Sequence, residues 1–342
     1  MMKQAFCIYF VDIVGTCNLR CPSCPVGNYQ DTDFISSPRP KGFMELALFE
    51  DILDKIKQES RHYEHIIISV YNWGEPLLHP KLPQFIEAIR ARGFISEIST
   101  NLNVKNIKAV VTASPNKLII SLSGYDNHIY SQTHKKGHSH LVISNLYKLR
   151  YYMDTLKTVF PVEVSYHLYK HNIGKDAERI RSISHDLGFR FVSDFTFLMP
   201  LEKNLKYLNG GQLSPQDEEL ISLMLIKPEE QVVLAQPDKE IDCSLRDLNV
   251  INFDGTTALC CAVYDYQYNV ADNFLTVSQA ELEERKRTHP LCQTCMDKGL
   301  HVIATAAPRA KLDKLINERL KALGSKIQRD DSHLRNYSFD YI

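Results

Sequence analysis

Three cysteines lie within eight residues near the start of the chain, as Cys17, Cys21 and Cys24 in the stretch CNLRCPSC. In this C-x3-C-x2-C spacing the sulfurs share one tight loop that can wrap a single metal centre. A cubane iron–sulfur cluster has four irons and is usually held by four thiolates, so three local thiolates leave one iron open to bind and activate another molecule. Structural zinc is the alternative, but it takes four protein ligands, and no fourth is evident near residues 17–24.

A second group of cysteines follows only after a long interval, since none lies between Cys24 and Cys243. Four thiolates from this group can complete one [4Fe-4S] cluster or one tetrahedral zinc site, and the spacing alone favours zinc somewhat. The layout predicts two separate metal sites. The expected ligands of the second are Cys243, Cys260, Cys292 and Cys295.

Two further cysteines stand outside these sets. Cys261 follows a predicted ligand and has three possible roles: a hydrogen-atom donor to a substrate radical, a ligand in place of Cys260, or an inert core residue. Cys7 lies in an apolar run and is most simply a core residue.

The elements that must position these cysteines alternate along the first 200 residues. Strands and helices in alternation favour a parallel sheet built from βαβ units, in which chemistry gathers at the carboxyl ends of the strands. Apolar, β-branched runs predict strands at 5–14, 65–71, 94–99, 117–123, 162–168 and 189–197. Helical periodicity predicts helices at 44–58, 80–92, 104–113, 139–155 and 174–187.

The alternation breaks after Pro200, where a helical stretch at 214–226 is followed by a proline-containing loop. We expect four segments: a barrel-like domain at 1–205, a linker at 206–240, a cysteine-rich module at 241–300 and a helical C-terminal tail at 301–342.

With the cysteine triplet placed after the first strand, the chain resembles the radical S-adenosylmethionine (SAM) enzymes. The resemblance implies a partial (β/α)6 TIM-like barrel in which Cys17, Cys21 and Cys24 hold a [4Fe-4S] cluster. It also implies that SAM binds the open iron and is cleaved to a 5'-deoxyadenosyl radical, which removes a hydrogen atom from a substrate.

Further motifs occur in the order that this family shows. Tyr71-Asn72-Trp73-Gly74-Glu75-Pro76 resembles the family's Gly-Gly-Glu-Pro turn, which receives the methionine ammonium of SAM; Trp73 replaces the first glycine. The resemblance implies cofactor contacts from the ends of later strands as well. The residues concerned are Ser99 and Asn101 after the third strand, Ser121 and Ser123 after the fourth, and Asn172 after the fifth.

The second cysteine group resembles the SPASM and twitch extensions of these enzymes, which open with a Cys and then Gly-x4-Cys about a dozen residues later. No cysteine follows Cys295, so the module looks like a twitch domain with one auxiliary [4Fe-4S] cluster rather than a full SPASM domain. Full ligation by four cysteines favours an electron conduit over a substrate-binding site.

Other polar residues are weaker candidates. Tyr264 and Asp265 could orient a substrate and accept its proton, although a solvated loop is the alternative. His167, Tyr169 and His171 share one face if their segment is extended, and either line the substrate pocket or pack at a strand end. The histidines of the stretch HKKGHSH, which are His134, His138 and His140, are expected in a solvated loop.

Composition narrows the function class. The 342 residues are 44% hydrophobic and 24% charged with a formal net charge of −1, as in an ordinary globular protein. A net charge this close to zero does not favour binding to nucleic acid or to an anionic membrane. No apolar run is long enough to span a bilayer. We therefore expect a cytoplasmic protein, where disulfides are rare and where metal binding and catalysis remain open to its nine cysteines.

The resemblance to twitch-bearing sugar dehydrogenases implies dehydrogenation of a small molecule such as a sugar or amino sugar, with the auxiliary cluster accepting one electron. A flavodoxin- or ferredoxin-type protein is the expected electron donor. Peptide maturases commonly carry a leader-binding domain before the barrel, whereas sixteen residues precede Cys17 here. A peptide maturase and an epimerase that uses Cys261 remain alternatives, as does a non-catalytic electron carrier or redox sensor.

Overall fold

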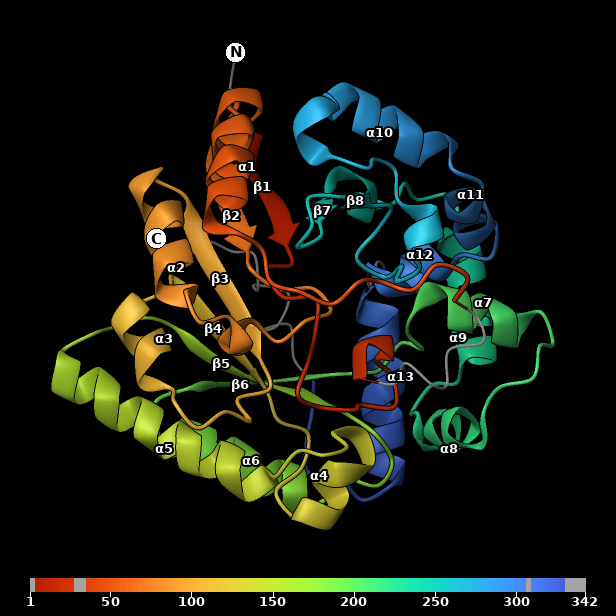
Figure 1. Cartoon of the computed structure of the whole chain (residues 1–342). Helices are drawn as coiled ribbons and strands as arrows, with labels where there is room; N and C mark the ends of the chain where they lie inside the picture. Colours follow the sequence, from red (N-terminus) through yellow and green to blue (C-terminus); the bar gives the residue numbers. More distant parts are fainter. Residues whose placement is uncertain (1–3, 28–34, 306–308, 330–342) are drawn as a thin grey trace.

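The computed structural model describes residues 4–27, 35–305 and 309–329. Six parallel strands follow one another across a single sheet, and helices cover its outer side (Figure 1). This arrangement confirms the α/β fold and the partial barrel expected from the sequence. The strands are β1 (Gln4–Val11), β2 (Tyr63–Ser69), β3 (Ile95–Thr100), β4 (Lys117–Ser121), β5 (Val162–His167) and β6 (Arg190–Asp194).

All five helices predicted between these strands are present, because their apolar positions recur with the helical period and face the sheet. In α1, for example, Phe49, Ile52, Leu53 and Ile56 are all buried. The helices are α1 (Leu46–Glu59), α2 (Leu82–Ala91), α3 (Lys108–Ala113), α5 (Ser139–Leu156) and α6 (Lys175–Asp186). A further short helix, α4 (Asn127–Thr133), begins at Asp126, whose side chain accepts a hydrogen bond from the backbone N–H of His128.

The segment expected to be a linker is folded against the barrel. It contains the end of α7 (Leu201–Leu208), which begins in the expected barrel domain, and the whole of α8 (Pro215–Leu223) and α9 (Pro228–Ala235). The expected proline-containing loop is wrong, because Pro228 stands in the first turn of α9, where its missing N–H leaves no hydrogen bond unmade. Leu220, Ile221 and Met224 bury their side chains against Tyr169 and Leu198.

The cysteine-rich module continues the sheet of the barrel. Its strand β7 (Asn249–Ile251) pairs parallel with β1, and β8 (Thr257–Ala258) pairs antiparallel with β7. The sheet order is therefore β6-β5-β4-β3-β2-β1-β7-β8. Gly255, in the turn between the two strands, has φ +85°, a left-handed conformation that favours glycine.

The rest of the module is a loop with two short 3₁₀ helices, Tyr266–Tyr268 and Phe274–Thr276, followed by α-helices that lie beside the β7–β8 hairpin (Figure 1). It contains α10 (Gln279–Thr288), α11 (Pro290–Asp297) and α12 (Leu300–Ala304), and α13 (Arg309–Ala322) follows. In the tail expected to be helical at 301–342, α12 and α13 are helical, whereas residues 323–329 are not. Residues 306–308 and 330–342 lie outside the described residues. Across the described ranges, no helix combines the length and apolarity that a bilayer span requires.

Candidate active site

A cavity of about 600 Å³ opens at the carboxyl ends of the barrel strands. The loop after β1 and the ends of β2 to β6 all contribute to its wall, as expected for parallel strands whose ends meet on one side of a sheet. Most of the residues predicted to hold the first cluster and SAM face this one space. They are Cys17, Cys21, Cys24, Trp73, Gly74, Glu75, Ser99, Asn101, Ser121 and Ser123, joined by Cys261 from the C-terminal module.

Hydrogen bonds hold the cysteine loop, residues 17–24, at several points. Sγ of Cys17 accepts hydrogen bonds from the backbone N–H of Leu19 at 3.4 Å and from Nδ2 of Asn101 at 3.6 Å. The buried ammonium of Lys203 donates to the carbonyl of Pro22 at 3.2 Å and pairs with Asp217 at 2.6 Å. Lys203 has no sequence signal of its own, because it lies on α7, which reaches the loop only in the folded chain.

The three thiols of this loop fit a cationic metal centre. Burial raises the pKa of Cys17 to about 12, and burial together with the neighbouring thiols holds the pKa of Cys21 well above its usual value. Such closely spaced thiols become thiolates together when a metal supplies the compensating positive charge. Their placement on one side of the large cavity is the arrangement that an [4Fe-4S] cluster with one open iron requires.

Glu75 is the most firmly positioned polar group of the cavity. Its Oε1 accepts hydrogen bonds from the Thr100 hydroxyl at 2.6 Å and from the Leu77 N–H at 3.0 Å, and its Oε2 accepts from the Asn101 N–H at 2.8 Å. Burial raises the pKa of this carboxyl. The end of β3 therefore holds an acidic group at a set orientation toward the cavity, where it can receive a cation such as an ammonium group.

Asp12 anchors the turn that carries Glu75. Its buried carboxylate accepts hydrogen bonds from the N–H groups of Trp73 at 3.0 Å and Gly74 at 3.2 Å, and it pairs with Arg39 at 3.1 Å. A Cβ on Gly74 would lie 1.7 Å from the carbonyl oxygen of Val14, so only glycine fits at this position. The sequence did contain a signal for Asp12, which is a charged residue inside the apolar run of the first strand.

Trp73 and Arg39 join the barrel to the C-terminal module. The indole N–H of Trp73 donates to the carbonyl of Val263 at 3.3 Å, and its ring packs edge-on against Tyr264. The guanidinium of Arg39 donates to Oδ1 of Asn252 at 2.7 Å and also lies over the ring of Tyr264. Replacing the family's first glycine by Trp73 thus adds a contact between the two parts of the chain.

Three predicted site residues do not reach the cavity. The amide of Asn172 is fully buried, donates to the carbonyls of Ser123 and His167, and accepts from the Tyr169 N–H, so it braces the loop after β5. Asp265 and Tyr264 are not among the residues that line the cavity either.

Asp265 has a structural role that its sequence position did not reveal. Its carboxylate accepts hydrogen bonds from the N–H groups of Ser36 and Ser37 and from both the backbone and the side chain of Gln267. The carboxylate is also 1% exposed. The expectations that Asp265 is a proton acceptor or lies in a solvated loop are both corrected, because burial and four donors commit it to fixing the loop.

The histidine-rich stretch is only partly solvated. His138 and His140 are exposed as expected, but His134 is buried and stacks on Tyr130 with ring centroids 4.5 Å apart. The solvated-loop prediction is wrong for His134 because α4 turns its ring inward, where it lines the large cavity. His167 and Tyr169 line the same cavity, whereas His171 does not.

The second group of cysteines lines a separate, small cavity of about 30 Å³. All four predicted ligands face it, together with Arg246, Lys286, His301 and apolar side chains such as Leu201 and Leu259. Nδ1 of His301 is buried without a hydrogen-bond partner among the described residues, although its Nε2 contacts the Ile241 carbonyl at 2.8 Å. A convergence of four thiols on one small cavity suits a fully ligated cluster.

None of the thiols of the two sites forms a disulfide, and no group of three or more His, Cys, Asp or Glu side chains in the described ranges is arranged around a single metal ion. A cubane is larger than one ion, and each of its four thiolates binds a different iron.

Comparison with known families identifies the barrel. Residues 11–163 match the model of the radical SAM superfamily. This part of the chain is a radical SAM domain. The family implies an enzyme that uses a [4Fe-4S] cluster and SAM, in agreement with the resemblance stated from the sequence.

A curated relative shares part of this domain. A tungsten-containing aldehyde ferredoxin oxidoreductase cofactor-modifying protein from Pyrococcus furiosus is 32% identical over 92 residues, which are 27% of this chain and 23% of that protein. The match therefore spans about a quarter of the relative's length.

Solved structures of radical SAM enzymes share the fold over a longer stretch. Native anSMEcpe with bound AdoMet has a TM-score of 0.50 at 14% identity, covering 82% of each chain. Streptococcus suis SuiB bound to its precursor peptide SuiA has a TM-score of 0.52 at 12% identity, covering 86% of this chain and 67% of that one. At these identities the likeness shows the fold alone, and it extends beyond the radical SAM domain.

Proposed function

We propose that this radical SAM enzyme is an oxidoreductase that carries a second, auxiliary [4Fe-4S] cluster and dehydrogenates a small molecule such as a sugar or amino sugar. One observation carries the proposal: two consecutive residues belong to two different cavities. Cys260 lines the small cavity with Cys243, Cys292 and Cys295, whereas Cys261 lines the large cavity with Cys17, Cys21 and Cys24.

This adjacency supplies a short covalent route between the two sites. When the first cluster and SAM are bound, the family's chemistry generates a 5'-deoxyadenosyl radical that removes a hydrogen atom from the substrate. Completing the two-electron oxidation of an alcohol to a carbonyl requires an electron acceptor near the substrate, and it releases the hydroxyl proton to solvent. The segment after β8 places Cys260 of the second site directly before Cys261 on the wall of the large cavity and is thus suited to that transfer.

The proposed contacts to SAM come from residues already held in place. Cys17, Cys21 and Cys24 would hold the first cluster, and the Glu75 carboxylate would receive the methionine ammonium. Ser99, Asn101, Ser121 and Ser123 present hydroxyl and amide groups from the ends of β3 and β4, where they can bind the polar groups of the cofactor. The apolar cluster of Val26, Trp73 and Tyr264 beside the cysteine loop would exclude water from this site.

The size of the large cavity supports a small substrate. About 600 Å³ lies in the usual range for a small-molecule site, and SAM would occupy part of it. The remaining wall carries His134, His167 and Tyr169, whose polar atoms suit a hydroxyl-rich molecule. SuiB binds a precursor peptide, so a peptide substrate is the alternative that a substrate screen must include.

A second candidate reaction is radical epimerisation. It is supported by the position of Cys261, a thiol on the wall of the large cavity from which a hydrogen atom could return to a substrate radical. A non-catalytic electron carrier is less well supported, because electron transfer alone does not require a polar cavity beside the cluster.

The proposal is tested by iron content and SAM cleavage. Anaerobically reconstituted protein should bind about eight irons per chain, and a variant with Cys17, Cys21 and Cys24 all changed to Ala about four, because each cubane holds four. Reduced by dithionite or by a flavodoxin- or ferredoxin-type donor, the wild type should release 5'-deoxyadenosine from SAM. Zinc in the second site would overturn the auxiliary cluster, and no deoxyadenosine from protein with an intact first cluster would overturn the enzyme.

Deuterium transfer then identifies the substrate. Candidate sugars, amino sugars and peptides labelled at single C–H positions should be incubated with the reduced enzyme, and deoxyadenosine analysed by mass spectrometry. A sugar that transfers deuterium and becomes a carbonyl compound supports dehydrogenation. Transfer from peptides alone would replace the small-molecule substrate by a peptide.

A further inference from the structure

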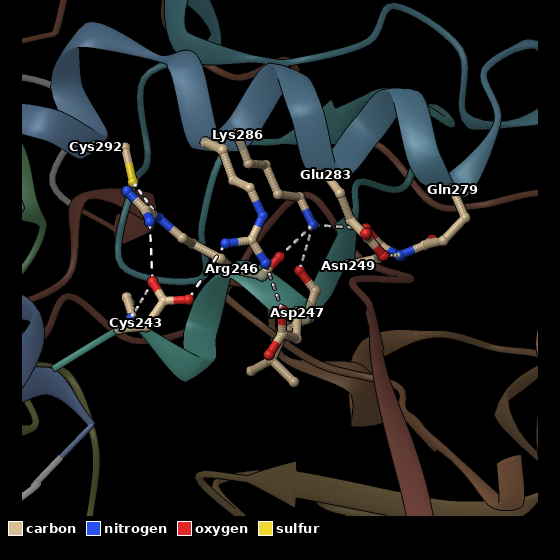
Figure 2. Close-up of polar contacts among 11 residues, drawn as sticks. Cys243, Arg246, Asp247, Asn249, Gln279, Glu283, Lys286 and Cys292 are labelled. Carbon is tan, nitrogen blue, oxygen red and sulfur yellow. Dashed lines mark hydrogen bonds and ion pairs between the residues drawn. The ribbon is translucent and has the colours of Figure 1, made fainter. Parts of the chain in front are cut away.

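Two cations line the small cavity beside its four thiols. Arg246, in the short 3₁₀ helix Ser244–Asp247, donates a hydrogen bond from Nε to Sγ of Cys292 at 3.3 Å. Lys286, on α10, is 1% exposed. Figure 2 shows the guanidinium of Arg246 against Cys292, and the side chain of Lys286 extending from α10 toward Asn249.

The ammonium of Lys286 is held by neutral acceptors. It donates to the carbonyl of Leu248 at 2.6 Å, to the carbonyl of Arg246 at 3.3 Å and to Oδ1 of Asn249 at 2.6 Å. Nδ2 of Asn249 in turn donates to Oε1 of Gln279 at 2.5 Å, which orients the amide oxygen toward Lys286 (Figure 2). Among the described residues no carboxylate forms an ion pair with Lys286, although Glu283 and Asp247 lie close enough to attract its charge.

The acidic partner of Arg246 lies on the solvent side. Asp242 pairs with Nη1 of Arg246 at 3.0 Å, but the Asp242 side chain is 62% exposed, and it also pairs with Arg287. Water screens an exposed carboxylate, so it offsets little of the positive charge that faces the cavity. The cavity wall therefore presents two positive charges and one N–H···S hydrogen bond to the four thiols.

We propose that Arg246 and Lys286 raise the reduction potential of the cluster in the second site and so make it an electron acceptor. This inference rests on the proposed function, because it assumes that the four cysteines bind a [4Fe-4S] cluster. Four thiolates give such a cluster a negative charge, which grows by one on reduction. Nearby cations and hydrogen bonds to sulfur stabilise the reduced form more than the oxidised form, and both are known determinants of cluster potential.

The test is a potentiometric titration of the full-length, reconstituted protein followed by electron paramagnetic resonance. The signal of the first cluster is recognised by its change on addition of SAM, and the other signal is that of the second cluster. We expect Arg246→Gln, which retains N–H donors without the charge, to lower the ratio of reduced to oxidised second cluster about tenfold at a fixed potential. For a one-electron couple this corresponds to a shift of about 59 mV. We expect Lys286→Met to have an effect of similar size.

Arg287→Gln is the matched control. It removes one positive charge from the next residue of α10, at a position that is 43% exposed and paired with Asp242 and Asp247. Its second cluster should titrate as in the wild type. Arg246→Lys, which keeps the charge, should recover most of the lost potential and provides a test if Lys286→Met fails to fold.

The outcomes separate this inference from the proposed function. A wild type with about four irons and one signal would refute the auxiliary cluster and therefore both proposals. A wild type with two clusters, in which Arg246→Gln and Lys286→Met titrate like Arg287→Gln, would overturn only the role of the two cations. A lower reduction potential of the second cluster in Arg246→Gln and in Lys286→Met, but not in Arg287→Gln, supports the role of the two cations.

Discussion

The hydroxyl of Thr100 donates a hydrogen bond to Oε1 of Glu75 at 2.6 Å, joining the end of β3 to the turn that follows β2. The carboxylate is 3% exposed and lies on the cavity wall. Because three donors fix its position, Glu75 is oriented before any ligand arrives, and pre-organisation of this kind lowers the entropic cost of binding.

Glu75→Gln should weaken SAM binding roughly tenfold or more while leaving the iron content unchanged. Hydrogen bonds to charged groups contribute about 1.5–3 kcal/mol, and the amide has lost the charge that attracts an ammonium. Affinity can be measured by equilibrium dialysis of reconstituted protein. Glu163→Gln is the control, since Glu163 is also a buried carboxylate of the sheet but lies outside the cavity. Equal affinities in the wild type and Glu75→Gln would show that SAM binds elsewhere.

Asp12→Asn should lower the free energy of unfolding by about 3–5 kcal/mol, because it leaves the Arg39 charge buried without its partner. Denaturant unfolding followed by circular dichroism measures this loss. Changing both residues, as Asp12→Asn with Arg39→Met, should cost less than the two single changes added together. Asp154→Asn breaks an exposed pair with Arg150 and should cost at most about 1 kcal/mol. A similar small cost for Asp12→Asn would contradict the anchoring role.

Cys261→Ala separates the two candidate reactions. Dehydrogenation does not require this thiol, so product formation and deoxyadenosine release should stay within a few-fold of the wild type. An epimerase would still cleave SAM but would fail to return a hydrogen atom to its product. Loss of product with continued deoxyadenosine release, measured by mass spectrometry in deuterated water, would therefore favour epimerisation. Cys7→Ala serves as the control, because Cys7 lies on β1 away from both cavities.

The stability of the fold should decrease in acid through His134. Burial, and secondarily the proximity of His167, lowers the pKa of His134 from 6.5 to about 3. The folded state therefore favours the neutral ring, and its contribution is complete above about pH 6.5 and is lost as the pH falls toward 3. The loss approaches about 1.4 kcal/mol per pH unit in this window.

The variant His134→Phe retains an aromatic ring against Tyr130 without a titrating group. Its unfolding free energy should fall less between pH 6.5 and pH 5 than that of the wild type. His185→Asn, at a side chain that is 91% exposed, should leave the pH dependence unchanged. If the free energy of unfolding depended on pH in the same way in the wild type and in His134→Phe, the neutral, buried state of His134 would be contradicted.

The sequence by itself determined the order of strands and helices, the cysteine triplet and most of the cavity wall. Apolar periodicity is a local property, so β1 to β6 and their helices could be predicted from adjacent residues. Parallel strands also place their carboxyl ends together, and the resemblance to radical SAM enzymes assigned Glu75, Asn101 and Ser121 to this edge of the sheet.

Only the tertiary structure decided which polar groups serve the cavity and which serve the fold. Asn172 and Asp265 have the residue types of a binding site, but backbone N–H and carbonyl groups from other segments use up their hydrogen bonds. Asp12, Lys203 and Lys286 acquire their roles from partners distant in the chain. The division of Cys260 and Cys261 between two cavities likewise depends on how the β7–β8 hairpin adds to β1, since hydrogen bonding between distant strands leaves no periodic signal in the sequence.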